Sequence, residues 1–504
     1  PQISPDGMRI IYVRNFSDIM TDKGLSNLWM VNFDGTNNRP LTTGEQSDRS
    51  PVWSHDGKKI VYFSNKSGKT ELYLKWMDSG EEQVIVNSEK SPSGVKWSPD
   101  DRYLAFSMFV GTTKVSPIKM PAKPAGAVWN APPKYIDNLN WRSDGVGELP
   151  SGNQQLFTVP ATGGTPRQLT DTPFNHSNPE WGKDGKHLYF SANMREDAEY
   201  ESQDSDLYSL SIADGKLTKL TNRYGPDGNP KISPDGKKIA YIGYDDKFKG
   251  YQLSQLYIAN VDGSNSTIIS EKFDRDVDGI QWAADGKALY FQYTEFGHTK
   301  IAKIATNGKV TDITEGLGGQ SLGRPYTSGE FSVSGNGNYA YSWAETYEPS
   351  DLGVGNNGKN QRITKVNEDL FECKELGKVE EIWYESSADG RKIQGWIVKP
   401  PKFDPNKKYP LILEIHGGPF SSYGASFSGE IQLMAAAGYV VLYTNPRGST
   451  SYGEEFGNLI DKKYPGEDYD DLMSGVDEVI SRGYINDKQL FVTGGSGGGV
   501  LTAW

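Results

Sequence analysis

The clearest chemical signal in this chain is the glycine-rich run 494–498, which places Ser496 in a G-x-S-x-G pattern. The residues before it, Phe491–Thr493, are typical of a β-strand, and apolar residues follow it. Such a pattern can hold a nucleophilic serine on a sharp turn between a strand and a helix. Glycines are needed on both sides because the serine backbone is strained and neighbouring chains pass within contact distance. The sequence therefore predicts that Ser496 is a catalytic nucleophile.

A second glycine pair, Gly417 and Gly418, comes directly after His416 and another apolar strand pattern. A serine that attacks a carbonyl group needs backbone N–H donors directed at the developing oxyanion. We expect Gly497 to supply one donor and Gly418, or else Gly417, to supply the other. His416 lies on the wrong segment for a base, and we expect it to pack beneath this loop.

The other two groups of a Ser-His-Asp set do not follow Ser496 in the sequence. In the α/β-hydrolase order the acid and the histidine come after the serine. Here the chain ends at Trp504 and all five histidines precede Ser496. We therefore expect the C-terminal part of the catalytic domain to be missing, the Asp and His to lie outside this chain, and the chain alone to be inactive.

The elements that must position these residues begin at about residue 374, where strand patterns alternate with helical patterns. This texture is typical of a parallel sheet with crossover helices. We expect a hairpin over 380–400, strands over 409–416, 439–443 and 490–493, and helices over 429–437 and 469–482. Arg447 lies in a predicted turn, 445–449, which we expect it to anchor. The acidic residues 467–471 favour the start of the next helix through its dipole.

The first three quarters of the chain repeat a turn motif of the type Ser-Pro-Asp-Gly, which an apolar strand pattern follows. Its seven copies, some of them eroded, begin at Ile3, Trp53, Trp97, Trp181, Ile232, Trp282 and Val333. Most copies are about 50 residues apart, which is the period of a four-stranded propeller blade. We therefore predict an all-β seven-bladed β-propeller over 1–372, its first blade incomplete at the N-terminus. An α/β-hydrolase domain follows over 373–504.

Two insertions interrupt the repeat. The first, 117–133, is rich in proline and is predicted to be an extended loop, and 135–141 is predicted to be a strand that completes the third blade. The second, 194–201, is acidic and follows the first strand of the fourth blade. It is either a solvated face or a group of carboxylates that binds the ammonium end of a peptide in the channel. Glu199 and Tyr200 are the candidate anchors.

Composition excludes several classes of function. The net charge of −12 and the lack of clustered Lys and Arg argue against nucleic-acid binding. No apolar run approaches the ~18 residues of a membrane helix. The single cysteine, Cys373, excludes an internal disulfide, and we expect it to be a buried structural thiol. No metal or organic cofactor is implied.

The repeated turns, together with 416–419, 445–449 and 494–498, resemble the prolyl oligopeptidase family of serine peptidases. Within that family the chain is most similar to the dipeptidyl peptidase five and acylaminoacyl-peptidase branch, in which a histidine precedes the two glycines. The resemblance implies that Ser496 is the nucleophile and that Gly497 and Gly418 form the oxyanion hole. It also implies that the propeller admits only peptides or unfolded segments, and that a second polypeptide completes the hydrolase domain.

We therefore expect a serine exopeptidase that releases dipeptides from the N-terminus of peptides through an acyl-enzyme intermediate. Alternatives are an acylaminoacyl peptidase or oligopeptidase, an esterase or lipase, and a non-catalytic propeller scaffold or binding module. The elbow argues against a scaffold, and the propeller argues against bulky lipid substrates. We expect peptide substrates, no nucleic-acid or membrane partner, and a periplasmic or secreted location, with the cytoplasm as the alternative. A homodimer stays open.

Overall fold

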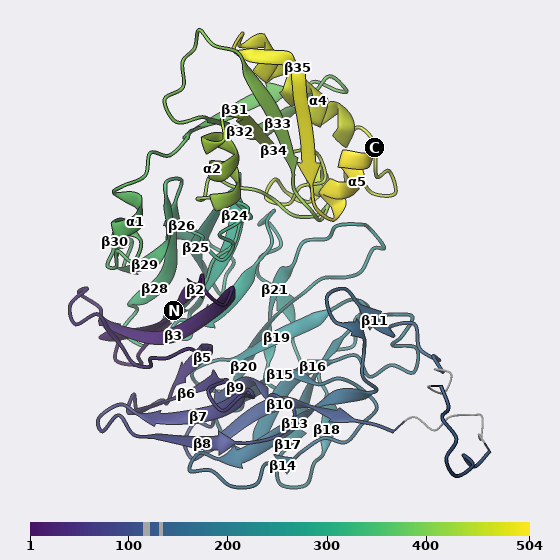
Figure 1. Ribbon diagram of the computed structural model, residues 1–504. Helices are drawn as coiled ribbons and strands as arrows, with labels where there is room; N and C mark the ends of the chain where they lie inside the picture. The colour runs from purple at the N-terminus through teal and green to yellow at the C-terminus, as the bar shows by residue number, and fades with distance from the viewer. Residues whose placement is uncertain (114–120, 131–134) are drawn as a thin grey trace.

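The computed structural model describes residues 1–113, 121–130 and 135–504. The chain forms a larger body of small β-sheets, which contains the N-terminus, and a smaller body of one sheet with helices, which contains the C-terminus (Figure 1). None of the helices described is long and apolar enough to cross a lipid bilayer.

Five sheets of the larger body have four antiparallel strands each. The first contains β1 (Gln2–Ile3), β2 (Arg9–Asp18), β3 (Lys23–Asn32) and β4 (Arg39–Pro40). The second contains β5 (Asp48–Trp53), β6 (Lys59–Ser64), β7 (Glu71–Trp76) and β8 (Glu82–Val86). The third contains β9 (Ser93–Trp97), β10 (Tyr103–Gly111), β13 (Gly152–Pro160) and β14 (Arg167–Gln168). The fourth contains β15 (Ser177–Trp181), β16 (His187–Ala192), β17 (Asp206–Ser211) and β18 (Leu217–Lys219). The fifth contains β19 (Asp227–Ile232), β20 (Lys238–Gly243), β21 (Gln255–Asn260) and β22 (Thr267–Ile268).

An eight-stranded sheet follows these five. It contains β23 (Asp278–Trp282), β24 (Ala288–Glu295), β25 (His298–Ala305), β26 (Val310–Leu317), β27 (Phe331–Val333), β28 (Tyr339–Glu345), β29 (Glu348–Asn356) and β30 (Lys359–Arg362). Its two halves are joined by one residue pair, Leu317 opposite Trp343, between β26 and β28. The predicted count of seven blades depends on dividing this sheet in two, so that count stays a prediction.

Each copy of the turn motif joins the first strand of such a group to the second. In the first copy, Ser4 Oγ donates to the carboxylate of Asp6 at 2.5 Å, and the N–H of Gly7 donates to the carbonyl of Ser4 at 2.8 Å. Gly7 has a φ of +73°, which side chains disfavour. The same serine-to-carboxylate bond recurs in other copies, for example at Ser54, Ser98 and Ser233. The motif is therefore a locally satisfied turn, as the sequence predicts.

The tryptophans that precede the motif connect neighbouring sheets. The indole N–H of Trp53 donates to the carbonyl of Gln2 at 3.1 Å, and that of Trp97 donates to the carbonyl of Val52 at 3.2 Å. The indoles of Trp181 and Trp282 likewise donate to the carbonyls of Lys96 and Lys231. Four innermost strands, β5, β9, β15 and β23, are thus each tied to the innermost strand of the sheet before them.

The first sheet packs against the last group of strands and closes the ring. The N–H of Ile3 donates to Ser332 Oγ at 2.8 Å, and Asn338 Nδ2 donates to the carbonyl of Gly7 at 3.0 Å. Ile3 also shares an apolar core with Leu352. The sequence predicts an incomplete first blade, whereas β1–β4 form a sheet of four strands, of which β1 has only two residues.

Two predictions about the larger body are wrong. Residues 135–141 form no strand, and β13 completes the third sheet instead, because it pairs with the whole length of β10. Between β10 and β13, the described residues form only the short hairpin of β11 (Arg142–Ser143) and β12 (Gly147–Glu148). The predicted loop at 117–133 lies partly outside the described residues. Cys373 is exposed rather than buried, because it lies in the connection between the two bodies, just after α1 (Glu368–Phe371).

The smaller body contains a five-stranded sheet with the order β31-β32-β34-β33-β35. Its strands are β31 (Lys378–Glu385), β32 (Lys392–Lys399), β33 (Tyr409–Ile415), β34 (Val440–Asn445) and β35 (Ile485–Gly494). Its helices are α2 (Gly429–Ala436), α3 (Glu454–Asn458), α4 (Asp468–Ser481) and α5 (Gly497–Ala503). The strands β34, β33 and β35 are parallel, and β31 and β32 form the predicted antiparallel hairpin.

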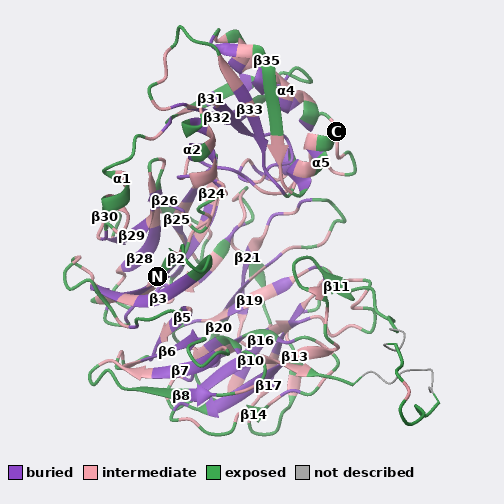
Figure 2. Cartoon of the chain, viewed as in Figure 1, coloured by how far each residue is buried: buried purple, intermediate pink, exposed green. Residues whose placement is uncertain are grey.

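The apolar strand β34 is covered on both faces because its side chains alternate. Val440 and Leu442 belong to the core that includes α4, whereas Val441 and Tyr443 belong to the core that includes α2. By contrast, β35 is an edge strand and stays largely exposed (Figure 2). Its Phe491 is 51% exposed although it contacts Tyr439 edge to face, so this apolar strand is only partly covered by the described residues.

Candidate functional site

Ser496 lies on the turn between β35 and α5, as the G-x-S-x-G pattern predicts. Its backbone has φ +55° and ψ −119°, a strained conformation for a residue with a side chain. Gly494 pairs in parallel with Ile415, which brings the turn to the carboxyl end of the sheet beside His416. Ser496 itself is exposed. A sharp turn that presents an exposed serine between a strand and a helix is the arrangement that an attacking hydroxyl needs.

The glycines around Ser496 are required by close backbone contacts. A Cβ atom on Gly498 would lie 2.2 Å from the carbonyl oxygen of Ile415, and one on Gly494 would lie 2.5 Å from the carbonyl oxygen of Gly498. A Cβ atom on Gly497 would lie 3.0 Å from the carbonyl carbon of Gly418. The start of α5 is therefore packed directly against the end of β33.

Gly418 and Gly497 come together beside the serine. A Cβ atom on Gly497 would be 3.2 Å from the nitrogen of Gly418, which is exposed. Within the described residues, neither of these two N–H groups donates to a protein acceptor. The N–H of Gly417, in contrast, donates to Tyr326 Oη at 2.7 Å. Of the two donors that the sequence leaves open, Gly418 is the one with a free N–H group.

His416 has the packing position that the sequence predicts. It is buried, and its Nδ1 and Nε2 lie 2.9 Å from the carbonyl oxygen of Gly417 and from Ser449 Oγ. Burial lowers the pKa of His416 to about 4, so the ring is neutral near pH 7. It connects the oxyanion loop, which contains Gly417 and Gly418, to the turn at 445–449, and within the described residues it forms no hydrogen bond with Ser496.

The lowered pKa of His416 makes stability depend on pH. Below its ordinary value of 6.5 the unfolded chain binds a proton that the folded chain, with a pKa of about 4, does not. The stabilisation is therefore complete above pH 6.5 and is lost as the pH falls toward 4. We expect this residue alone to lower the free energy of unfolding by about 2 kcal/mol between pH 8 and pH 5. Urea unfolding of the wild type and of His416→Gln checks this, and equal pH slopes would contradict it.

No histidine among the described residues is placed to take a proton from Ser496. Three of the others have their own partners: His55 contacts Asp101, His176 contacts Thr172, and His187 contacts Asp184. In the part of the chain that the structure describes, none of the five histidines forms a hydrogen bond with Ser496. Nor do the described residues include a group of His, Cys, Asp and Glu that could hold a metal ion.

A loop of the larger body reaches this site, which the sequence does not predict. Tyr326, between β26 and β27, accepts the hydrogen bond of Gly417 and contacts Tyr423 edge to face. Arg324 Nε lies 3.2 Å from Glu414 Oε1, and a Cβ atom on Gly495 would be 2.8 Å from the Arg324 guanidinium. Glu414 is buried, which raises the pKa of its carboxyl group.

Replacing Tyr326 by phenylalanine removes the acceptor of the Gly417 N–H group. We expect the oxyanion loop to shift, because an unsatisfied buried donor costs about 1–3 kcal/mol. With the proposed second polypeptide present, the rate at which a fluorophosphonate probe labels Ser496 should then fall roughly fivefold or more, since each 1.4 kcal/mol corresponds to about a factor of ten. The matched control is Tyr347→Phe, whose hydroxyl lies away from this loop on β31. An unchanged labelling rate in Tyr326→Phe would refute a positioning role.

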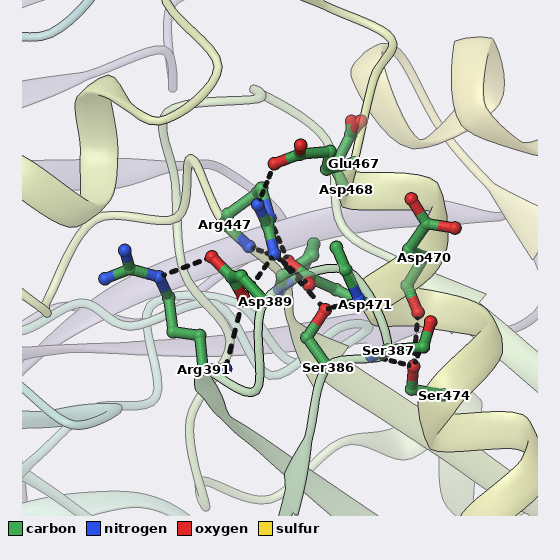
Figure 3. Close-up of polar contacts among 12 residues, drawn as sticks. Ser386, Ser387, Asp389, Arg391, Arg447, Glu467, Asp468, Asp470, Asp471 and Ser474 are labelled. Atoms are coloured by element: carbon green, nitrogen blue, oxygen red, sulfur yellow. Dashed lines mark hydrogen bonds and ion pairs between the residues drawn. The ribbon is translucent and has the colours of Figure 1, made fainter.

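Arg447 anchors the turn at 445–449, as predicted, and Figure 3 shows the side chains that surround it. Its Nε and Nη2 each lie 2.9 Å from an oxygen of Asp471, and its backbone N–H donates to Asp471 at 2.8 Å. Asp389 and Glu467 complete the ion pairs. Acidic residues of the first turn of α4 therefore hold this arginine as well as complementing the helix dipole.

The structure does not bring the proposed substrate anchors to Ser496. The carboxylate of Glu199 accepts a hydrogen bond from the N–H of Leu139, and Tyr200 is 76% exposed. Arg195 holds the start of this insertion through Asp197 and Asp204. The insertion is thus fixed to the larger body, and no contact joins Glu199 or Tyr200 to the described residues of the serine site.

Comparison with known proteins places this geometry in a family. A model described as the prolyl oligopeptidase family matches residues 425–504, and one described as the TolB beta propeller domain matches residues 1–120. The Pyrococcus horikoshii acylaminoacyl peptidase has the same fold, with a TM-score of 0.80, 21% identity, and coverage of 98% of this chain and 73% of that one. The larger body is therefore a β-propeller, and the smaller body has the peptidase fold.

Two sequence relatives match along the whole chain. The "uncharacterized peptidase YuxL" of Bacillus subtilis is 31% identical over 522 residues, which cover 100% of this chain and 77% of YuxL. Dipeptidyl-peptidase 5 of Porphyromonas gingivalis is 29% identical over 526 residues, which cover 100% of this chain and 74% of that protein. Since these matches run through the whole chain, the prediction of a missing C-terminal part is not borne out and is not carried further. The chain belongs to the prolyl oligopeptidase family of serine peptidases.

Proposed function

We propose that this chain is the nucleophile-bearing chain of a serine exopeptidase that releases dipeptides from the N-terminus of peptides. The observation that carries the proposal is the strained, exposed Ser496 beside two free backbone N–H groups, those of Gly497 and Gly418. The relatives named dipeptidyl-peptidase 5 support the dipeptidyl specificity.

In the proposed reaction, Ser496 Oγ attacks the carbonyl carbon of the scissile peptide bond while a base takes its proton. The carbonyl oxygen becomes an oxyanion, which accepts hydrogen bonds from the N–H groups of Gly497 and Gly418. Collapse of this intermediate breaks the C–N bond, and the leaving amine takes the proton from the base. Water, activated by the same base, then attacks the acyl-enzyme ester and releases the dipeptide with a free carboxylate.

We propose that the base, a histidine, and its acid come from a second polypeptide. Two observations support this: no histidine of the described chain contacts Ser496, and the strand that leads to it is an exposed edge. Leu490 and Val492 are 42% and 46% exposed, so this strand offers backbone and apolar groups for pairing. Such pairing on β35 would place added residues next to the serine turn.

The anchor for the substrate ammonium is proposed to include Glu199 and Tyr200, on the propeller. A carboxylate there fixes the distance from the N-terminus to Ser496, and this distance sets the dipeptide product. The bond between Glu199 and Leu139 favours a second candidate, an acylaminoacyl peptidase, because it leaves that carboxylate partly occupied. A blocked N-terminus needs no carboxylate.

The nucleophile is tested by intact mass spectrometry after reaction with a fluorophosphonate probe, on the wild type and on Ser496→Ala. We expect one probe on Ser496 of the wild type when a second polypeptide copurifies, and none on the variant. Labelling of the 504-residue chain alone would overturn the proposal of an external base. An unlabelled serine in the presence of the second polypeptide would overturn the assignment of Ser496.

Specificity is tested with a pair of fluorogenic dipeptide substrates that differ only in an N-terminal acetyl group. A dipeptidyl peptidase cleaves the free amine faster, and Glu199→Gln narrows that preference because it removes the charge that binds the ammonium. Preference for the acetylated substrate would favour the acylaminoacyl peptidase. A short ester cleaved faster than both peptides would refute the peptidase specificity.

A further inference from the structure

The channel of the propeller contains a cationic layer that the peptidase chemistry does not use. On each innermost strand, one residue directly precedes the first residue of the turn motif. In chain order these residues are Gln2, Val52, Lys96, Glu180, Lys231, Gln281 and Ser332. Three neighbouring strands, β9, β15 and β19, thus contribute Lys96, Glu180 and Lys231 at the same position relative to the turn motif.

The two lysines share one carboxylate oxygen. Lys96 Nζ lies 3.8 Å and Lys231 Nζ lies 3.5 Å from Glu180 Oε2. The layer therefore has two positive charges and one negative charge. The pKa of Lys96 is lowered, and the nearby Lys231 ammonium is the largest cause, so repulsion between the lysines outweighs the attraction of Glu180. Another anion would relieve this repulsion.

Two cavities adjoin this layer. A cavity of about 430 Å³ is lined by residues from β1, β9, β15, β19, β23 and β27, and a second cavity, of about 360 Å³, is lined mainly from β5, β9, β15 and β19. Lys96 and Lys231 line both cavities. Arg49 lines the second cavity, and Glu180 is the one acidic residue among the described residues that lines either cavity. The charged residues that line these two cavities are thus three cations and one anion, in a chain whose net charge is −12.

Two asparagines add neutral donors to the second cavity. Asn178 and Asn229 have φ values of +53° and +57°, at irregularities where β15 and β19 shift register against their neighbours. Within the described residues, neither side-chain amide has a hydrogen-bond partner, and Arg49 forms no ion pair. Positive charge, amide donors and a cavity therefore occur together here, and this combination can bind an anion with oxygen acceptors.

We propose that this layer, formed by Lys96 and Lys231 with Arg49, Asn178 and Asn229 beside it, binds a carboxylate of a peptide in the propeller channel. Lys96, Lys231 and Glu180 together have a net charge of +1, which a single carboxylate would neutralise. Either a peptide C-terminus or an acidic side chain can supply it. The source of the ligand rests on the proposed peptidase function, since peptide substrates are what the channel would admit.

Binding, rather than cleavage, tests the site, so the outcome does not depend on catalysis. Isothermal titration calorimetry of the Ser496→Ala chain would use an N-acetylated alanine hexapeptide as the free acid and as the C-terminal amide. The acetyl group removes any contribution from the ammonium anchor. We expect the acid to bind roughly tenfold or more tightly than the amide, as one charge-assisted contact allows. Equal affinities would overturn the proposal.

Two variants with opposite expected effects on the affinity for the free acid make the test specific. Lys96→Met with Lys231→Met should abolish the difference between acid and amide, whereas Glu180→Gln should tighten binding of the acid, because it removes the competing carboxylate. Misfolding cannot produce a gain of affinity. The matched control is Lys58→Met with Lys237→Met, which removes two exposed lysines of turn motifs. A difference that persists without Lys96 and Lys231 would overturn the assignment.

Two further ligands identify the source of the anion. An amidated peptide with a terminal glutamate binds like the acid if the layer accepts any carboxylate, and binds like the amide if it selects the C-terminus. Both outcomes support a carboxylate site. Inorganic phosphate that binds while the acid and the amide bind alike would mean a general anion site and would refute peptide recognition.

Discussion

Replacing Arg447 by methionine is expected to lower the free energy of unfolding by about 3–5 kcal/mol, the usual effect of removing one partner of a buried ion pair. The Arg447 side chain is 2% exposed and that of Asp471 is fully buried. The variant leaves the Asp471 carboxylate without its cation in a region from which water is excluded. Urea unfolding monitored by circular dichroism measures the change.

The matched control is Arg391→Met, because Arg391 also pairs with Asp389 (Figure 3) but its side chain is 30% exposed. Exposed ion pairs contribute about 0–1 kcal/mol, so this variant should change stability by no more than that. Adding Asp471→Asn to Arg447→Met should restore part of the lost stability, because it removes the unpaired charge. Similar losses in the two arginine variants would contradict the assignment of Arg447 as the buried anchor.

With the proposed second polypeptide present, replacing Gly498 by alanine is expected to reduce fluorophosphonate labelling of Ser496 by roughly 100-fold, the effect of a displacement of about 1 Å at a reacting group. The added Cβ atom would lie 2.2 Å from the carbonyl oxygen of Ile415. Because the neighbour is backbone, β33 or α5 must move, and the serine turn moves with them. Stopped labelling reactions, analysed by mass spectrometry, give the rate.

Gly499→Ala is the control for that substitution. Its Cβ atom would be 3.5 Å from the nearest heavy atom, the carbonyl oxygen of Gly494, which is an ordinary contact. Alanine is also favoured over glycine in a helix by about 1 kcal/mol. We expect the Gly499→Ala variant to be labelled at the wild-type rate and the Gly498→Ala variant to be labelled more slowly. This result would show that labelling of Ser496 requires the close backbone approach at Gly498. Two equally fast variants would refute this reading of the glycines.

The parts of the fold that could be predicted from the sequence are those that local bonds determine. The Ser-Pro-Asp-Gly turns satisfy their own hydrogen bonds within five residues, so each copy can be recognised by itself. The turn at Ser496 is likewise set by adjacent glycines and by strand and helix patterns. The buried strand β33 was predictable because its apolar run is short and bounded by turn residues.

The missed parts depend on contacts between distant segments. Tyr326 and Gly417 are 91 residues apart, and nothing in the sequence around Tyr326 distinguishes it from other propeller tyrosines. Residues 135–141 alternate like a strand, but β13 already pairs with every residue of β10, which leaves no place for another strand there. The prediction that Cys373 is buried used its residue type alone. The residue type does not indicate that Cys373 lies in the connection between the two bodies, where it is exposed.

The contact between β1 and β27, which closes the ring of sheets, has a consequence for biosynthesis. The bond from Ile3 to Ser332 joins residues 329 positions apart. Since ribosomes add about 5–20 residues per second, β1 is made roughly 15–65 s before its partner strand exists. During that time the sheets can fold one after another through local contacts, but the ring stays open. Closure is therefore a late step of translation, and the first sheet must remain unaggregated until it occurs.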